Sequence, residues 1–448
     1  MLTTIVLRPA LLACCSMISL AAEDAGRKPL MRDFMGINFH TFQVQDPALI
    51  AQATRLARDY HPYPWDVQDR PGEVPPFPLS REAIHNGRQL DWLDLYGSWR
   101  KAGFTSVDAC IMSIDYTRDK VGLPNGMADL ERYAQNFASF FGPSGMHQMV
   151  DAVEIENEPG KFTTEQYVDV FKAMGRGFRA GDPKLTIATC TMAALPPDQW
   201  EKPIQSIAGM EDLYDVINMH TYSFKSKSGW PAFERTYPEA PGIRYLEAVD
   251  AMLAYRNSRP QMRNKPIWVT EFGYDAASAA ALKTADPKWV SSTELQQAQW
   301  SVRSWLLFSA MDVARAYLYW WNDNDGKSFH GASGILRKNQ PKPAFWAARH
   351  LQQALGAYRF SKVIVRQVDG LHAFEFSNDT GESAWAVWSG TSGKTDAAMK
   401  MPAVPRKPLR IEVMALQDGA PANEAVDHSD AGLRMQVGET PRFVFFGK

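Results

Sequence analysis

Two glutamates, Glu158 and Glu271, each stand at the end of a short apolar run, just before residues that break a strand. Pro159-Gly160 follows Glu158 directly, and Gly273 follows Glu271 after one residue. Two carboxyl groups that face each other can cleave a glycosidic bond, because one protonates the leaving oxygen while the other attacks the anomeric carbon. The sequence therefore predicts a pair of catalytic carboxyl groups, provided that the fold brings the two strand ends together.

The elements that would position these glutamates follow a regular alternation between about residues 30 and 350. Short apolar or β-branched runs alternate with longer amphipathic stretches, which is typical of repeated βα units around a parallel sheet. The predicted strands are 34–42, 56–61, 105–112, 149–156, 185–190, 215–220, 266–271 and 314–321. Eight such strands favour an α/β fold of the (β/α)8 TIM-barrel type, and no Gly-x-Gly-x-x-Gly loop follows any of them. Functional residues of such a barrel lie at the carboxyl ends of its strands.

The pattern of apolar runs in the sequence changes after residue 355. Short alternating runs separated by Gly, Asp, Asn and Pro are typical of a small all-β module. We therefore predict a catalytic barrel over 23–355 and a C-terminal β-sandwich domain over 356–448.

Four motifs lie in order at the ends of predicted strands. They are Asn157-Glu158-Pro159, His220-Thr221-Tyr222, Thr270-Glu271-Phe272-Gly273 and Trp320-Trp321. With these motifs the sequence resembles glycoside hydrolase clan A, the retaining (β/α)8-barrel glycosidases. The resemblance covers roughly residues 30–350 and leaves the family within the clan unassigned.

The resemblance implies a role for each motif residue. Glu158 would be the general acid/base and Glu271 the nucleophile, with the two carboxyl groups about 5–5.5 Å apart. Asn157 would hydrogen-bond the sugar 2-hydroxyl, Tyr222 would donate to the nucleophile, and His220 would brace this network.

Further residues of the candidate site follow from the same resemblance. Trp320 or Trp321 would form the floor under the cleaved sugar, although strand alternation places at least one of the two in the core. Arg58 is the candidate for a cation near the nucleophile, where it would lower the carboxyl pKa. His40, near the end of the first predicted strand, would line the sugar pocket.

One assignment stays open, because Glu154, Glu156 and Glu158 share the same strand parity. Glu156 is therefore an alternative acid/base, although the strand break at Pro159 favours Glu158.

The predicted partner is a polysaccharide or oligosaccharide, cleaved by double displacement without a cofactor. A formal net charge of −2 gives no reason to expect nucleic acid or an anionic membrane as a partner. No Cys/His cluster has the spacing of a metal site. The alternatives are a carbohydrate-binding or scaffold protein on a glycosidase barrel, and a transglycosylase or exopolysaccharide-processing enzyme with the same residues.

Residues 1–22 have the pattern of a signal peptide, and their apolar run is too short to span a bilayer. They predict export to the periplasm or the extracellular space. A lipid anchor at Cys14 and a cytosolic protein with an apolar start are the alternatives. Cleavage would leave Cys110 and Cys190, which we expect to be buried thiols or a single bridge.

Overall fold

The computed structural model describes most of residues 27–448. The gaps in this description are 42–45, 69, 86, 116–119, 122, 124, 160–161, 190–200, 227–232, 284–288, 327–330, 368–369, 395, 403, 405 and 431. The predicted signal peptide, the anchor candidate Cys14 and the bridge candidate Cys190 all lie outside the described residues.

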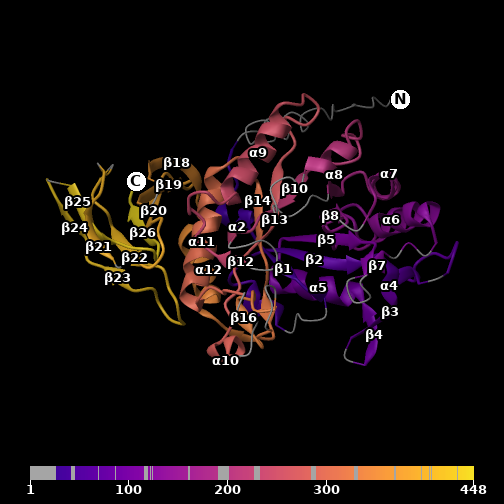
Figure 1. The fold of residues 1–448 in the computed structure, drawn as a ribbon, viewed down its shortest axis with the longest axis horizontal. Coiled ribbons are helices and arrows are strands. Elements are labelled where there is room, and N and C mark those ends of the chain that lie inside the picture. The colour runs from indigo at the N-terminus through magenta and orange to yellow at the C-terminus, as the bar shows by residue number, and fades with distance from the viewer. Residues whose placement is uncertain are drawn as a thin grey trace, which may run out of the picture.

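Within the described residues, eight parallel strands form the barrel at the centre of the molecule (Figure 1). They are β1 (Met35–Phe39), β2 (Leu56–Pro62), β5 (Ser106–Met112), β8 (Ala152–Ile155), β9 (Thr186–Ala188), β10 (Ile217–His220), β13 (Ile267–Phe272) and β14 (Arg315–Leu318). Their order is β10-β13-β14-β1-β2-β5-β8-β9, and a parallel bridge between Ala188 and Val216 joins the two ends. Each strand falls at one of the eight predicted runs, so the predicted barrel is confirmed.

Helices cover the outside of the barrel, the first before β1 and the others after strands (Figure 1). They are α2 (Met31–Phe34), α3 (Pro47–Ile50), α4 (Tyr63–Val67), α5 (Trp92–Ala102), α6 (Met127–Phe141), α7 (Thr164–Gly181), α8 (Glu201–Ser206), α9 (Tyr245–Asn257), α10 (Ala279–Leu282), α11 (Glu294–Ala310) and α12 (Pro343–Leu355). The two longest, α7 and α11, begin with capping boxes, in which Thr163 pairs with Gln166 and Thr293 with Gln296. Among the described helices, none combines the length and apolarity that crossing a bilayer requires.

The alternation of side chains along β2 separates the barrel interior from the helix layer. Asp59 and His61 face outward, where the hydroxyl of Tyr96 on α5 bonds to both of them. Arg58 and Tyr60 point inward, towards the other strands. A barrel strand therefore delivers polar groups to the lumen while its other face is packed against helices.

The C-terminal part consists of antiparallel sheets, as predicted for this region. A six-stranded sheet contains β18 (Arg359–Arg366), β19 (Leu371–Ser377), β20 (Ser383–Ser389), β26 (Arg442–Phe446), β22 (Arg410–Val413) and β23 (Asn423–Glu424), and a three-stranded sheet contains β21 (Ala397–Lys400), β25 (Gly432–Val437) and β24 (Asp427–Ser429) among the described residues. Trp385 and Val387 of β20 belong to the core shared with the smaller sheet, whereas Ala386 and Trp388 belong to the core shared with the barrel helices. This alternation fixes the module against the barrel.

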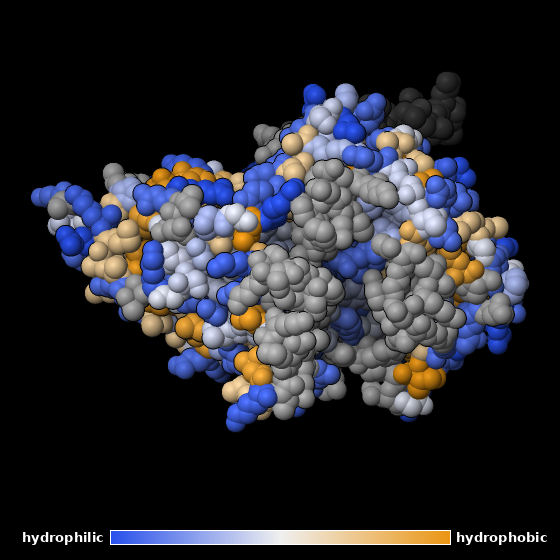
Figure 2. Space-filling view, viewed as in Figure 1, coloured by the Kyte–Doolittle hydropathy of each residue, from blue (hydrophilic) through white to orange (hydrophobic). Residues whose placement is uncertain are grey.

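Short strands complete the described elements. They are the hairpin β3 (Leu79–His85) and β4 (Arg88–Asp91), then β6 (Ile114–Asp115), β7 (Lys120–Val121), β11 (Phe224–Ser226), β12 (Phe233–Arg235), β15 (Asn322–Asp323), β16 (Leu336–Arg337) and β17 (Gln340–Pro341). On the face in Figure 2, hydrophilic residues gather where α9 approaches the C-terminal sheets, and apolar residues lie in small separate groups.

Candidate active site

An irregularity in β13 turns Glu271 into the barrel. The pairing of β10 with β13 shifts register after Met219, so that His220 lies opposite Glu271. The Thr270 hydroxyl accepts a hydrogen bond from Asn218 inside the barrel, and Glu271, the next residue, also reaches the lumen to contact Arg58. Strict alternation would have sent one of these two neighbours to the helix layer, so the bulge delivers both side chains to the interior.

Three donors hold the Glu271 carboxylate at the mouth of the barrel, where 4% of the residue is exposed. Its Oε1 accepts from Arg58 Nη1 at 3.1 Å and from the Tyr60 hydroxyl at 2.5 Å. Its Oε2 accepts from the Tyr222 hydroxyl at 2.6 Å. Burial alone would raise the pKa of Glu271, but His220, Arg58 and the two hydroxyls outweigh it and lower the pKa to about 2. Glu271 is therefore a carboxylate at neutral pH.

Arg58 is fully buried and uses all five of its N–H groups. Nε and Nη2 donate to Glu154 Oε2 at 2.9 and 2.6 Å, and Nη2 also donates to Asn157 Oδ1 at 2.8 Å. Nη1 donates to Asn38 Oδ1 at 2.7 Å and to Glu271. The guanidinium thus fixes the nucleophile candidate and the side-chain amide of Asn157 relative to each other.

Glu158 lies beyond the end of β8, with 38% of its side chain exposed. Its Oε1 is 2.9 Å from His220 Nδ1, and the same nitrogen is 3.5 Å from Glu271 Oε2. An oxygen of Glu158 lies within 4.8 Å of an oxygen of Glu271. The two carboxyl groups predicted from the strand ends therefore face each other across His220.

The backbone after β8 separates the three acids that share strand parity. Glu156 and Glu158 have φ values of 72° and 48°, in the left-handed region that costs an L-residue about 1–2 kcal/mol. Both oxygens of Glu156 accept from the amide of Ser113, at 2.8 and 2.9 Å. Glu154 instead pairs with Arg58. Only Glu158 of the three is placed at Glu271, so the geometry does not support Glu156 as the acid/base.

The remaining predicted residues divide between the site and the core. His40 lies against Trp320, with ring centroids 4.3 Å apart, and burial lowers its pKa to about 4, so it is neutral at pH 7. Trp321 is fully buried and packs against Phe39 in the layer between barrel and helices. Of the tryptophan pair, Trp320 is therefore the residue on the side of the site.

Several residues at the site were not predicted. Tyr60 donates to Glu271, and Tyr319 bonds His40 Nε2 through its hydroxyl at 3.1 Å. The signal for Tyr60 was its position two residues after Arg58, on the same strand face. Asn38, which accepts from Arg58, gave no signal of its own because its partners lie on other strands, β2, β13 and β14.

The ligand atoms of Glu158, His220 and Glu271 lie within 4.8 Å of one another, a spacing that would also suit a metal ion. The guanidinium of Arg58, however, contacts Glu271 directly and opposes a further positive charge there. The hydrogen-bond donors around Glu271 thus fit a carboxylate that binds no metal ion better than one that does.

Comparison with known proteins gives structural matches only. No protein-family model matches the sequence, and no curated protein matches it significantly. A family 39 glycoside hydrolase from the gut symbiont Bacteroides cellulosilyticus WH2 superposes with a TM-score of 0.69 at 16% identity, over 95% of this chain and 82% of that one. A glucosidase from Croceicoccus marinus gives 0.63 at 12% identity, and a monomeric beta-xylosidase from Caulobacter crescentus CB15 gives 0.58 at 14%, each over 94% of this chain and 97% of the other.

The chain has the fold of clan A glycoside hydrolases. The matches include glycoside hydrolases of families 39, 30 and 51, so they show the fold and do not single out one family. They extend over 94–95% of this chain, so they include the C-terminal sheets as well as the clan A barrel.

Proposed function

We propose that the protein is a retaining β-glycoside hydrolase, with Glu158 as general acid/base and Glu271 as nucleophile. The observation that carries the proposal is Glu271 itself, a buried carboxylate held ionised by Arg58, Tyr60 and Tyr222. Its oxygen lies within 4.8 Å of an oxygen of Glu158. This separation fits the ~5–5.5 Å of retaining enzymes rather than the ~6.5–9.5 Å that leaves room for a water in inverting ones.

In the first step, Glu271 attacks the anomeric carbon while Glu158 protonates the departing glycosidic oxygen. Because Glu271 is held ionised, Glu158 is the carboxyl left to carry the proton that the leaving group needs. Its partial exposure lets it reach a substrate above the barrel, and His220 fixes its direction through the 2.9 Å contact. The products are a free leaving-group alcohol and a glycosyl ester of Glu271.

In the second step, Glu158 removes a proton from water, which attacks the anomeric carbon and releases Glu271. Asn157 contributes in both steps, because Arg58 occupies its Oδ1 and so orients the amide nitrogen as the donor for the sugar 2-hydroxyl. Such a hydrogen bond strengthens as the transition state develops positive charge on the sugar.

The substrate class is a poly- or oligosaccharide, and we propose export, based on residues 1–22. A binding or scaffold protein would not need a nucleophile candidate that four neighbouring groups keep ionised. A transglycosylase would share every residue described here and differ only in the acceptor that Glu158 activates.

The test is hydrolysis of a panel of β-linked polysaccharides and aryl glycosides by the purified protein, followed as reducing-sugar or phenol release. Glu271→Gln keeps the shape of the side chain and should abolish turnover. Glu158→Gln should slow glycosides with poor leaving groups far more than activated aryl glycosides, since only the former need the proton. An NMR spectrum of the first product anomer should show retained configuration; inverted configuration would refute the double displacement.

A further inference from the structure

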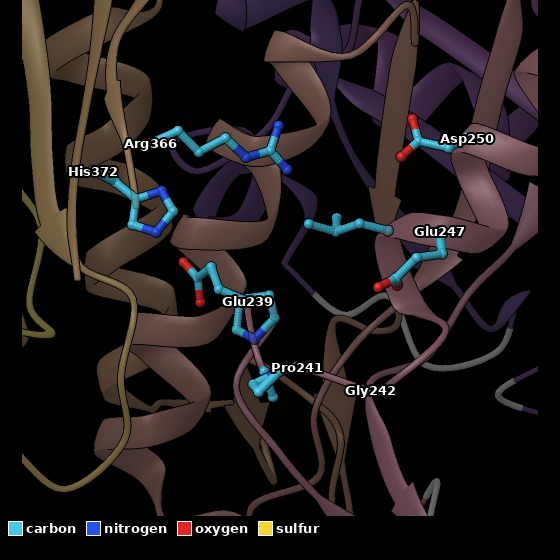
Figure 3. A pocket seen from close by; sticks show the side chains of 10 residues that line it. Glu239, Pro241, Gly242, Glu247, Asp250, Arg366 and His372 are labelled. Carbon is cyan, nitrogen blue, oxygen red and sulfur yellow. The ribbon is translucent and has the colours of Figure 1, made fainter. Parts of the chain in front are cut away.

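Glu239, beside the pocket between α9 and the C-terminal sheets, shows what a buried carboxylate needs (Figure 3). Both of its oxygens accept hydrogen bonds from Arg303, and Oε1 also accepts from Trp388 Nε1 at 2.6 Å. The negative charge of Glu239 is therefore matched by a cation and by hydrogen bonds, as burial of a charge requires.

Asp108, on β5 inside the barrel, is a buried carboxyl group without such donors. The residue is fully buried, and among the described residues no group donates to either of its oxygens. On β8, Oε1 of the fully buried Glu154 also lacks a donor from the described part of the chain, whereas Oε2 accepts from Arg58. Leaving three such oxygens without a donor would be costly if both groups were carboxylates.

The strand register places these two carboxyl groups close together. Asp108 pairs with Arg58 on β2 and with Ala152 on β8, and Glu154 follows Ala152 by two residues on the same face of β8. The side chains of Asp108 and Glu154 are within hydrogen-bonding contact. Because carboxylates only accept, this contact becomes a hydrogen bond when one of the two groups carries a proton.

The cations near Asp108 do not supply the missing donor. Arg58 uses all five of its N–H groups on other partners. On β14, Arg315 Nη1 donates to Ser106 Oγ at 3.0 Å and to the hydroxyl of Tyr317 at 3.3 Å. The pKa of Asp108 is raised well above its ordinary value, because burial and the carboxyl group on β8 outweigh the two arginines. Asp108 is therefore the carboxyl group that holds a proton.

We propose that Asp108 is a positioning residue of the active site, with its protonated carboxyl group donating to Glu154 Oε1. This hydrogen bond leaves Glu154 Oε2 to accept from Nε and Nη2 of Arg58, at 2.9 and 2.6 Å. Arg58 in turn donates to Glu271 Oε1 and to Asn157 Oδ1. Asp108 thereby acts on the nucleophile candidate through two side chains. Its effect on catalysis rests on the proposed function, whereas the proton between the two acids does not.

The proton can be tested without any activity. Infrared difference spectra between the wild-type protein and Asp108→Asn at pH 7 separate the C=O band of a carboxylic acid from the bands of a carboxylate. We expect the substitution to remove a carboxylic-acid band that shifts in deuterated water. Asp169→Asn is the matched control, because Asp169 is exposed on α7 and its substitution should remove carboxylate bands. Loss of carboxylate bands in Asp108→Asn would overturn the proposal.

The positioning role is tested by the kinetics of an aryl glycoside that the wild-type protein hydrolyses. Asp108→Asn keeps a donor of similar size for Glu154 Oε1, and kcat should stay within about twofold of the wild-type value. Asp108→Leu has a similar volume but no donor, so kcat should fall about tenfold or more with little change in KM. Asp169→Leu, the matched exposed substitution, should leave kcat unchanged.

A kcat that falls equally in Asp108→Asn and Asp108→Leu, or in neither, would overturn the positioning role. If Asp108→Leu fails to fold, as detected by thermal melting, Asp108→Ala takes its place under the same criterion. Absent hydrolysis of every glycoside by the wild-type protein would count against the proposed function alone. The infrared spectra would then still decide whether Asp108 holds the proton.

Discussion

Removing the hydroxyl of Tyr222 tests how the protein keeps Glu271 ionised. The hydroxyl donates to Glu271 Oε2 at 2.6 Å in a buried site, and a hydrogen bond to a charged group is worth about 1.5–3 kcal/mol. One pKa unit corresponds to about 1.4 kcal/mol, so Tyr222→Phe should raise the pKa of Glu271 by about 1–2 units. Starting from about 2, the pKa would reach about 3 to 4.

The sign of the effect on the rate follows from the proposed role of Glu271 as the nucleophile. A nucleophile works as the carboxylate, so activity is lost on the acid side as the pH falls through its pKa. The acid limb of kcat/KM against pH reports that pKa in the free enzyme. The limb should therefore move to higher pH in Tyr222→Phe, while the rate at its plateau falls because the carboxylate is less well oriented.

The assay is kcat/KM on an aryl glycoside hydrolysed by the wild-type protein, measured across the acid range. Tyr274→Phe is the control, because its hydroxyl bonds Ser304 in the helix layer at 2.9 Å instead of Glu271. An acid limb that does not move in Tyr222→Phe would refute the account of Glu271. So would an equal movement in Tyr274→Phe, because the shift would then reflect a general loss of packing.

Three further outcomes can be measured. Glu154→Gln removes the charge that faces buried Arg58 at 2.6 Å and should destabilise the fold by about 3 kcal/mol in denaturant titrations; a loss below about 1 kcal/mol would contradict the pairing. The ordinary pKa of a glutamate is 4.5, and that of Glu271 is lowered to about 2. At a pH above 4.5 this difference stabilises the folded state, and the stabilisation is lost as the pH falls towards about 2. Wild-type stability should accordingly fall more steeply over that interval than that of Glu271→Gln, and parallel curves would argue against it. Chelation by EDTA should leave hydrolysis unchanged, since Arg58 disfavours a cation beside Glu271; inhibition reversed by added metal would overturn this reading.

The sequence was sufficient for the order of the barrel elements and for the strand ends near which the candidate residues lie. Alternation of apolar runs with amphipathic stretches is a local pattern, and it located every strand of the barrel within a few residues. The stop signals at Pro159 and Gly273 are also local, because Pro and Gly act on the backbone where they stand. In the structure β13 ends at Phe272, next to Gly273, whereas β8 ends at Ile155, before Glu158. The C-terminal β-strands followed from the same kind of evidence.

Only the tertiary structure decided which side chains meet. Alternation could not show that Thr270 and Glu271 both face the lumen, because a bulge interrupts the period of two. It could not separate Glu154, Glu156 and Glu158, because left-handed backbone after β8 sends them in different directions. The contact of Arg58 with Glu271 joins residues 213 positions apart, and such a contact depends on barrel closure rather than on any local pattern.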